Sequence, residues 1–181
     1  MTSDVPGAGV RQATAADAPT VGRLLHDFNT EFDTPTPSAQ DFAARFGELL
    51  GRGDVLVLLA NHGDEAVGMA YLTLRPTPYG QGPLAELEEL YVVPKLRGQG
   101  IGSALITAAL ERVRARDAIE MRINVDEIDT DVRRFYERHG FASTVPGTGS
   151  RMLCYLRELD EGRSMPGTPP EPTGYPGHND A

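Results

Sequence analysis

The residues best suited to chemistry are Gly98, Gly100 and Gly102, which alternate with other residues at the start of an apolar run in "VVPKLRGQGIGSALI". Glycine inside a helix costs roughly 1 kcal/mol relative to alanine. A helix N-terminus, however, carries unpaired N–H groups and a partial positive charge, and glycine lets an anion approach them without a Cβ in the way. Arg97 adds a cation beside them. The stretch therefore predicts a diphosphate site; the alternative is close packing of a helix on a strand.

Two common diphosphate motifs do not fit this stretch. A Walker loop needs G-x-x-x-x-G-K-[ST], and the Lys-Ser/Thr pair is absent. A dinucleotide fingerprint needs G-x-G-x-x-G, but Ser103 stands where the third glycine would be. The chain also begins with predicted helices and antiparallel hairpins instead of a βαβαβ unit. Both nucleotide-binding classes are thereby disfavoured.

The longer stretch "LEELYVVPKLRGQGIGSAL" resembles the acyl-CoA signature of the GNAT superfamily of N-acetyltransferases, [RQ]-x-x-G-x-[GA]. Arg97, Gly100 and Gly102 fill that pattern, and "RRFYERHGF" resembles the family's later "FYE..GF" motif. The resemblance covers roughly residues 10–160. It implies acetyl-CoA as co-substrate and an amine acceptor. It also implies that the diphosphate is bound by the backbone amides of Gly98, Gln99, Gly100, Ile101, Gly102 and Ser103.

The same resemblance implies where the rest of the cofactor lies. In GNAT enzymes the sheet is splayed beside its fourth strand, and the pantetheine arm lies in the gap like an extra strand. The backbone of Leu90, Tyr91 and Val92 is then expected to pair with that arm. The amide of Val92 or Leu90 would face the thioester carbonyl as the oxyanion donor.

Tyr136 and Glu88 are the predicted catalytic side chains. Tyr136 matches the position at which many family members protonate the leaving thiolate, although it could instead be a packed core tyrosine. Glu88 matches a glutamate of the spermidine/spermine acetyltransferases in this family. It could serve as a base, as an anchor for a cationic amine, or as an exposed strand carboxylate. Strand alternation predicts that Glu89 points to the opposite face, toward solvent or in a structural role.

Asp129 is a departure from the family pattern. Many members have an asparagine at this position that reaches the cofactor. An aspartate can cap the following helix equally well, but its charge would lie poorly beside phosphate. The sequence therefore predicts no direct bond from Asp129 to the cofactor.

Hydrophobic periodicity and turn residues predict the elements that position these residues. Strands are expected at 10–13, 55–60, 66–75, 84–93, 119–125, 141–145 and 151–159. Helices are expected at about 14–28, after an N-cap at Ser38, at 100–116 and at 129–139. The fold class is α/β: the GNAT fold, with a mixed, mostly antiparallel sheet of about seven strands and about four helices. One β-α-β crossover supplies its parallel pair.

Three regions are expected along the chain: a flexible N-terminus at 1–9, an acetyltransferase domain at 10–160 and a Pro/Gly-rich tail at 161–181. The last twenty residues contain five prolines and four glycines. Such a segment forms few backbone pairs of its own. We therefore expect the tail to lie against its own domain or a second subunit, with Tyr175 buried, and we expect a homodimer.

Composition limits the partners. A net charge of −9 disfavours nucleic acid and suits either a cationic substrate or simple solubility. The sequence has no apolar run long enough to span a membrane and no signal peptide pattern, so a cytoplasmic protein is expected. The histidine spacing predicts no metal site. Cys154, the single cysteine, is expected to be buried. The competing hypothesis is a non-catalytic acyl-CoA-binding sensor or structural protein on the same fold.

Overall fold

A computed structural model describes residues 8–32, 35–157 and 159. Its centre is a five-stranded sheet with the strand order β1-β2-β3-β4-β5. Neighbouring strands are antiparallel except for the parallel pair β4 and β5. The strands are β1 (Ala8–Gln12), β2 (Val55–His62), β3 (Glu65–Arg75), β4 (Leu84–Val92) and β5 (Glu120–Arg122). The predicted fold class, with its hairpins and single crossover, is confirmed.

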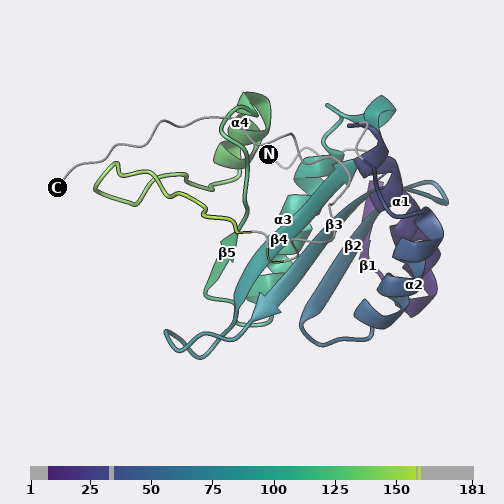
Figure 1. The fold of residues 1–181 in the computed structure, drawn as a ribbon, viewed down its shortest axis with the longest axis horizontal. Helices are drawn as coiled ribbons and strands as arrows, with labels where there is room; N and C mark the ends of the chain where they lie inside the picture. Colours follow the sequence, from purple (N-terminus) through teal and green to yellow (C-terminus); the bar gives the residue numbers. More distant parts are fainter. Residues whose placement is uncertain (1–7, 33–34, 158, 160–181) are drawn as a thin grey trace.

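Helices cover both faces of this sheet (Figure 1). The helices are α1 (Ala18–Thr30), α2 (Ala39–Leu49), α3 (Ile101–Arg114) and α4 (Thr130–Arg138), with short 3₁₀ turns η1 (Ala15–Asp17) and η2 (Pro94–Leu96). Two separate buried clusters show the layering. One joins the sheet to α3 and Tyr136 of α4, and the other joins it to α1 and α2. The sheet is therefore the middle layer of three.

Local sequence signals account for the first helices. The Ser38 side chain accepts a hydrogen bond from the Asp41 N–H, and the Asp41 carboxylate accepts one from the Ser38 N–H, which is a capping box. Proline lies in the first turn of α1, where its missing N–H leaves no intrahelical bond unmade. Both predicted helix starts are confirmed.

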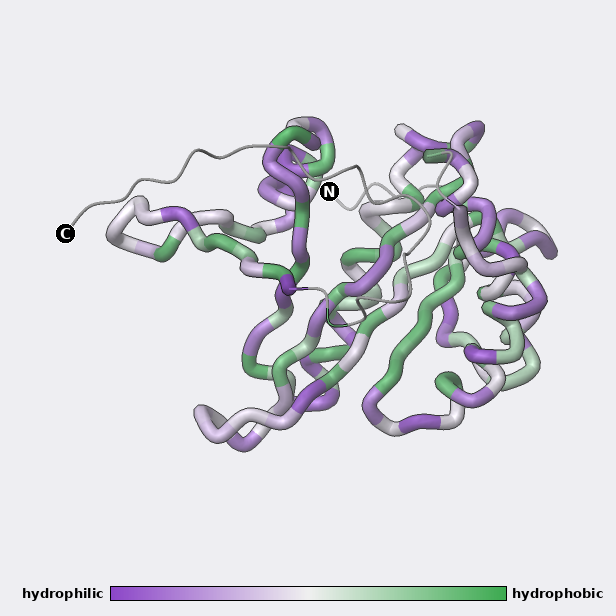
Figure 2. The backbone as a smooth tube through the Cα atoms, viewed as in Figure 1, coloured by the Kyte–Doolittle hydropathy of each residue, from purple (hydrophilic) through white to green (hydrophobic). Residues whose placement is uncertain are grey.

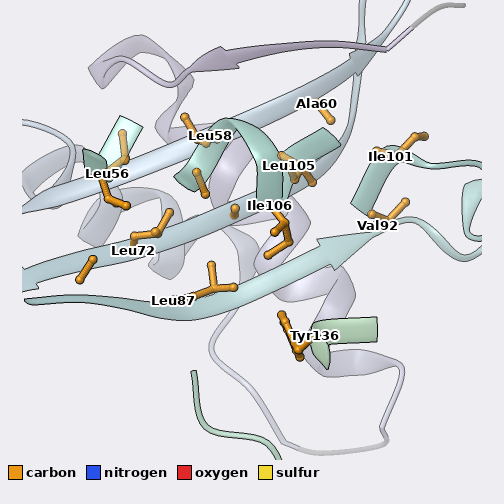
Figure 3. Close-up of a cluster of buried hydrophobic side chains, with 14 of the residues drawn as sticks. Leu56, Leu58, Ala60, Leu72, Leu87, Val92, Ile101, Leu105, Ile106 and Tyr136 are labelled. Atoms are coloured by element: carbon orange, nitrogen blue, oxygen red, sulfur yellow. The ribbon is translucent and has the colours of Figure 1, made fainter. Parts of the chain in front are cut away.

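The core is formed mainly by strands whose residues are apolar on both faces. β2 is buried from Val55 to Ala60, because α3 covers one side of it and α1 and α2 cover the other. Figure 2 shows hydrophobic residues along the middle strands of the sheet. Figure 3 shows how Leu58 and Leu72 from the sheet meet Leu105 and Ile106 of α3.

The two last predicted strands are not formed, so the described part of the chain has five strands where about seven were expected. Residues 141–145 and 151–159 make one isolated bridge, Thr144 to Arg151. The side chains of Tyr155 and Leu156 are about nine-tenths exposed, at 90% and 87%. An apolar run such as Met152 to Leu156 favours a strand but does not provide the neighbouring strand that it must pair with. Cys154, predicted to be buried there, is exposed for the same reason.

Other expectations are met only in part or lie outside the described residues. The strand predicted at 119–125 is shortened to β5, and β1 begins at Ala8, inside the N-terminal segment that was expected to be flexible. The tail 161–181, with Tyr175, lies outside the described residues, so its contact and the homodimer remain predictions. Within the described ranges, no helix is long and apolar enough to cross a membrane.

Candidate active site

The site begins with a strand that is paired along only part of one edge. β4 pairs with β5 at Leu84, Ala85 and Glu86, whereas its pairing with β3 continues to Val92. Figure 1 shows β4 and the chain after β5 diverging beyond that point. The second half of β4 therefore has an edge to which β5 contributes no backbone partner, as expected for a splayed sheet.

The backbone direction along this edge can be derived from one hydrogen bond. The Val93 N–H donates to the carbonyl of Val67, next to β3, at 2.9 Å. In a strand the N–H and C=O of one residue point to the same side, and the side alternates from residue to residue. The N–H and C=O groups of Leu90 and Val92 therefore point away from β3. The peptide group of Tyr91 points toward β3. Leu90 and Val92 are therefore the residues of the predicted triplet whose backbone faces the open edge.

The glycine loop follows directly after this edge and leads into α3. Gly98 has φ +74° and Gly100, the N-cap of α3, has φ +85°. Residues with a Cβ rarely adopt this left-handed region, so both glycines are required by the turn. Ile101, the first residue of α3, is buried beside Val92 (Figure 3). The loop thus brings the N-terminus of α3 to the end of β4.

Gly102 serves a different purpose. A Cβ built at this position would lie 3.4 Å from the ring of Phe135 on α4. This is an ordinary van der Waals distance, so Gly102 packs beside Phe135 without being required by close packing, whereas Gly98 and Gly100 are required by the backbone conformation of the turn. Gln99 lies in the loop, where its side chain donates to the Lys95 carbonyl at 3.3 Å, and Ser103 lies in the first turn of α3.

Arg97 does not extend freely into the loop. Its Nε donates to the Val92 carbonyl at 2.8 Å, and its Nη2 donates to a carboxylate oxygen of Glu31 at 2.7 Å. The guanidinium carbon also lies 5.7 Å from the centre of the Tyr91 ring. The cation is therefore next to the predicted anion site but is bound by groups of the protein.

Glu88 and Glu89 are separated by an irregularity in β4 that strand alternation did not predict. Tyr71 lies opposite Glu89 and Leu72 lies opposite Leu87, so Glu88 is an extra residue, as in a β-bulge. Glu89 is half-buried, so the first of its two expected roles, facing solvent, is wrong, whereas the structural alternative is untested. Burial, and then the charge of Glu88, raises its pKa to about 7. Glu88 is exposed and accepts a hydrogen bond from the Thr73 hydroxyl.

Sequence reasoning missed Glu89 as a functional candidate, although the sequence held one signal. Leu87 and Leu90 pack into the same hydrophobic cluster although they are three positions apart. In a regular strand, residues three positions apart face opposite sides of the sheet. That Leu87 and Leu90 flank "EE" and are both apolar is therefore compatible with one inserted residue between them.

Tyr136 lies on α4 at the margin of the core (Figure 3). Its side chain is buried, with edge-on ring contacts to Phe135 and Phe141. Burial, and then the negative charge of Glu89, raises the pKa of its phenol to about 12. Glu89 and Tyr136, on different elements, therefore influence the same region of the site. Asp129 is the N-cap residue of α4.

Two further features lie apart from this arrangement. A cavity near the start of β4 is lined by residues that include Leu74, Pro76, Gln81, Pro83 and Arg116. It lies at the opposite end of β4 from the glycine loop. Among the described residues, no group of three or more His, Cys, Asp or Glu side chains could hold a metal ion.

A half-paired strand that leads through a glycine loop into a helix N-terminus, on a sheet of this order, is the arrangement expected for an N-acetyltransferase of the predicted family. The chain belongs to the acetyltransferase (GNAT) family, whose sequence profile matches residues 21–141. The predicted family and enzyme class are confirmed.

Individual relatives agree with this assignment. The chain is 31% identical over 138 residues to the aminoalkylphosphonate N-acetyltransferase of Salmonella typhimurium, covering 76% of this chain and 86% of the relative. A crystal structure of a provisionally assigned acetyltransferase from Arthrobacter sp. FB24 is 50% identical, with a TM-score of 0.78, over 83% of this chain and 96% of the other. The aminoglycoside N-acetyltransferase AAC(6')-Iy in complex with CoA has the same fold, with a TM-score of 0.67 at 20% identity, over 84% and 95% of the two chains.

Proposed function

We propose that this enzyme transfers the acetyl group of acetyl-CoA to a primary amine of a small molecule or peptide by direct attack. The observation that carries the proposal is the continuity between the open edge of β4 and the glycine loop. The edge offers strand backbone that β5 does not pair, although the Val92 carbonyl accepts a hydrogen bond from Arg97, and the loop offers helix N-terminal amides. They follow one another in the order of a pantetheine arm and a diphosphate.

Each part of acetyl-CoA has a proposed position on this path. The pantetheine arm lies along Leu90, Tyr91 and Val92, where the outward peptide groups of Leu90 and Val92 supply its hydrogen bonds. One of their amides polarises the thioester carbonyl as the oxyanion forms. The diphosphate binds the amides from Gly98 to Ser103, with Arg97 beside them.

Glu89 is the proposed proton acceptor for the amine. The attacking nitrogen must be neutral, and a carboxylate with a pKa of about 7 is a stronger base than an ordinary glutamate. Glu88 takes part as the neighbouring charge that keeps this pKa high and as an anchor for a cationic amine. Of the roles that the sequence left open for Glu88, the base is thereby proposed for Glu89 and the anchor for Glu88.

Tyr136 is the proposed general acid. As the amine nitrogen bonds to the carbonyl carbon, a tetrahedral oxyanion forms; its collapse breaks the C–S bond. The CoA thiolate then takes the phenolic proton, and the proton lost by the nitrogen goes to Glu89. That proton returns from Glu89, directly or through water, to the Tyr136 phenolate, so both side chains end in their starting states. A phenol whose pKa is raised to about 12 stays protonated until the thiolate forms.

The acceptor is proposed only as a class. The acidic composition and the Glu88–Glu89 pair suit an amine that carries positive charge. The Salmonella relative is named for an aminoalkylphosphonate and AAC(6')-Iy for aminoglycosides, so both compound classes are reasonable acceptors to test.

A thiol-release assay tests the function. The purified chain is mixed with acetyl-CoA and a panel of an aminoalkylphosphonate, an aminoglycoside and a polyamine, and acetylated product is identified by mass spectrometry. We expect amine-dependent thiol release matched by acetylated amine. Tight acetyl-CoA binding without turnover on any amine, in an extended panel as well, would instead support the sensor hypothesis.

A further inference from the structure

Glu31 connects the end of α1 to the glycine loop. It follows α1 directly, and its carboxylate accepts the 2.7 Å hydrogen bond from Arg97 although 66 positions separate the two residues. The same guanidinium also donates to the Val92 carbonyl. The Arg97 side chain is therefore bound at two points, the end of α1 and the end of β4.

Tyr91 is a third member of this arrangement. Its side chain is 3% exposed, and its ring lies under the Arg97 guanidinium. Burial, and then a hydrogen bond from its hydroxyl to the Glu31 carboxylate, raises the pKa of Tyr91. The ring of Phe28, in the last turn of α1, lies 5.4 Å from the Tyr91 ring. Glu31 thus accepts a hydrogen bond from Arg97 and lies beside the Tyr91 hydroxyl of β4.

The position of Glu31 is unfavourable for α1 itself. The C-terminus of a helix carries partial negative charge, so a carboxylate there is disfavoured. The last turn of α1 contains no basic residue that would offset this cost. Less than a quarter of the Glu31 side chain, 23%, is exposed. The favourable interactions of Glu31 therefore come from Arg97 and Tyr91 and not from its own helix.

We propose that Glu31 is a positioning residue for acyl-CoA: it fixes Arg97, and through Arg97 the backbone of the Gly98–Ser103 loop. This inference rests on the proposed diphosphate site. Glu31 does not touch the diphosphate. Because Arg97 at the start of the loop is already held, the loop loses less conformational entropy when the diphosphate binds.

The test compares Glu31→Gln with a matched control. Asp27→Asn removes the same charge one turn earlier on α1, where Asp27 pairs with Arg23 of the same helix at 3.2 Å. Titration calorimetry with CoA should give a Kd roughly 5-fold weaker for Glu31→Gln and unchanged for Asp27→Asn. Because the loop and not the reacting groups is affected, kcat at saturating acetyl-CoA should stay within about 2-fold of wild type.

A donor without the diphosphate separates positioning from general damage. With acetyl-pantetheine, which lacks both phosphates and nucleotide, Glu31→Gln and wild type should have equal rates. An Arg97→Lys/Glu31→Gln double variant should bind CoA no more weakly than the weaker-binding of the two single variants, because each substitution breaks the same Arg97–Glu31 contact. If Glu31→Gln melts at a lower temperature, Glu31→Asp, which keeps the charge but shortens the reach, replaces it in the same assays.

Three results would overturn the inference. The first is unchanged CoA affinity in Glu31→Gln. The second is tighter CoA binding, which would mean that Glu31 competes with the diphosphate for Arg97. The third is that Glu31→Gln slows the reaction equally with acetyl-CoA and with acetyl-pantetheine. Gly100→Asp is measured alongside to keep the proposed function separate. If Gly100→Asp weakens CoA binding and Glu31→Gln does not, only the role of Glu31 is wrong. If neither variant changes binding, the diphosphate site itself is wrong.

Discussion

The Glu89 carboxylate of β4 and the Tyr136 phenol of α4 are close enough that the charge of the first raises the pKa of the second. Burial is the larger cause of both shifts, to about 7 for Glu89 and about 12 for Tyr136. Near neutral pH the pair therefore holds one group that exchanges a proton readily and one that keeps its proton. Acyl transfer to an amine needs a base for the nucleophile and an acid for the leaving thiolate.

Replacing Tyr136 with phenylalanine should slow turnover by about 10- to 1000-fold, because the thiolate loses its proton donor. Acetyl-CoA affinity should stay near that of wild type, since the ring contacts with Phe135 and Phe141 are kept. Tyr155→Phe is the control, because Tyr155 is 90% exposed. Steady-state rates and calorimetry measure both quantities, and equal rates for Tyr136→Phe and wild type at about pH 7 would remove Tyr136 from the mechanism.

Replacing Glu89 with glutamine should remove one limb of the pH profile. In wild type kcat/KM should rise as the pH passes through about 7, because Glu89 must be ionised to accept a proton. Glu89→Gln should lack that rise and keep only the dependence set by the amine. Glu88→Gln should move the limb to lower pH, since Glu88 helps to raise the pKa of Glu89. A limb near pH 7 that persists in Glu89→Gln would assign the base to another group.

The same substitution should change the pH dependence of stability. The pKa of an ordinary glutamate carboxyl is 4.5, whereas the pKa of Glu89 in the folded chain is about 7. Below the lower value Glu89 is protonated in both states; as the pH rises through this window the unfolded chain loses its proton first, so the free energy of unfolding falls. Glu89→Gln avoids this loss. The free energy of unfolding of Glu89→Gln, taken relative to wild type at the same pH, should be higher at about pH 8 than at about pH 4. Allowing for partial solvent screening, this increase should be about 1–2 kcal/mol.

Urea denaturation at the two pH values measures this difference. Each variant is compared with wild type at the same pH, so that effects common to the whole chain cancel. Glu86→Gln, on the same strand, is the control for loss of one negative charge. If the free energy of unfolding of Glu89→Gln relative to wild type is the same at both pH values, Glu89 has the same pKa in the folded and unfolded chains.

A Gly100→Asp change should greatly weaken acetyl-CoA binding. It places a side chain and a negative charge at the N-cap of α3, where the diphosphate is proposed to bind, and at a φ of +85°. Gly53→Asp is the control, because a Cβ there meets no atom within 4 Å. Calorimetry on the two folded variants tests the site, and wild-type affinity in Gly100→Asp would show that the diphosphate binds elsewhere.

Much of the fold was predictable because its signals are local. Ser38 with Asp41 begins a helix, and the apolar run of β2 marks a strand buried on both faces. The glycine loop was predictable because Gly98 and Gly100 have backbone conformations that other residues avoid. The chain at 151–159 was predicted wrongly, because its apolar run does not reveal whether a neighbouring strand is within reach.

The site was less predictable because its key relationships are not local. The bulge at Glu88 depends on how β3 and β4 are aligned, so alternation within β4 alone placed Glu89 incorrectly. The contact between Glu31 and Arg97 joins residues 66 positions apart, and their spacing carries no signal. The roles of Tyr136 and Glu88 came from resemblance to the family and remain proposals.

Hydrogen–deuterium exchange with and without acetyl-CoA tests the central claim, that the cofactor lies on the open edge of β4 and ends at the glycine loop. Strand amides that gain a partner and helix N-terminal amides that bind an anion both exchange more slowly. Acetyl-CoA should therefore slow exchange in the peptides that contain Leu90 and Val92 and in those spanning Gly98 to Ser103. Exchange in β1, at the far edge of the sheet, should not change. Saturating acetyl-CoA that leaves both the β4 and the loop peptides unprotected, while protecting another segment, would contradict the account.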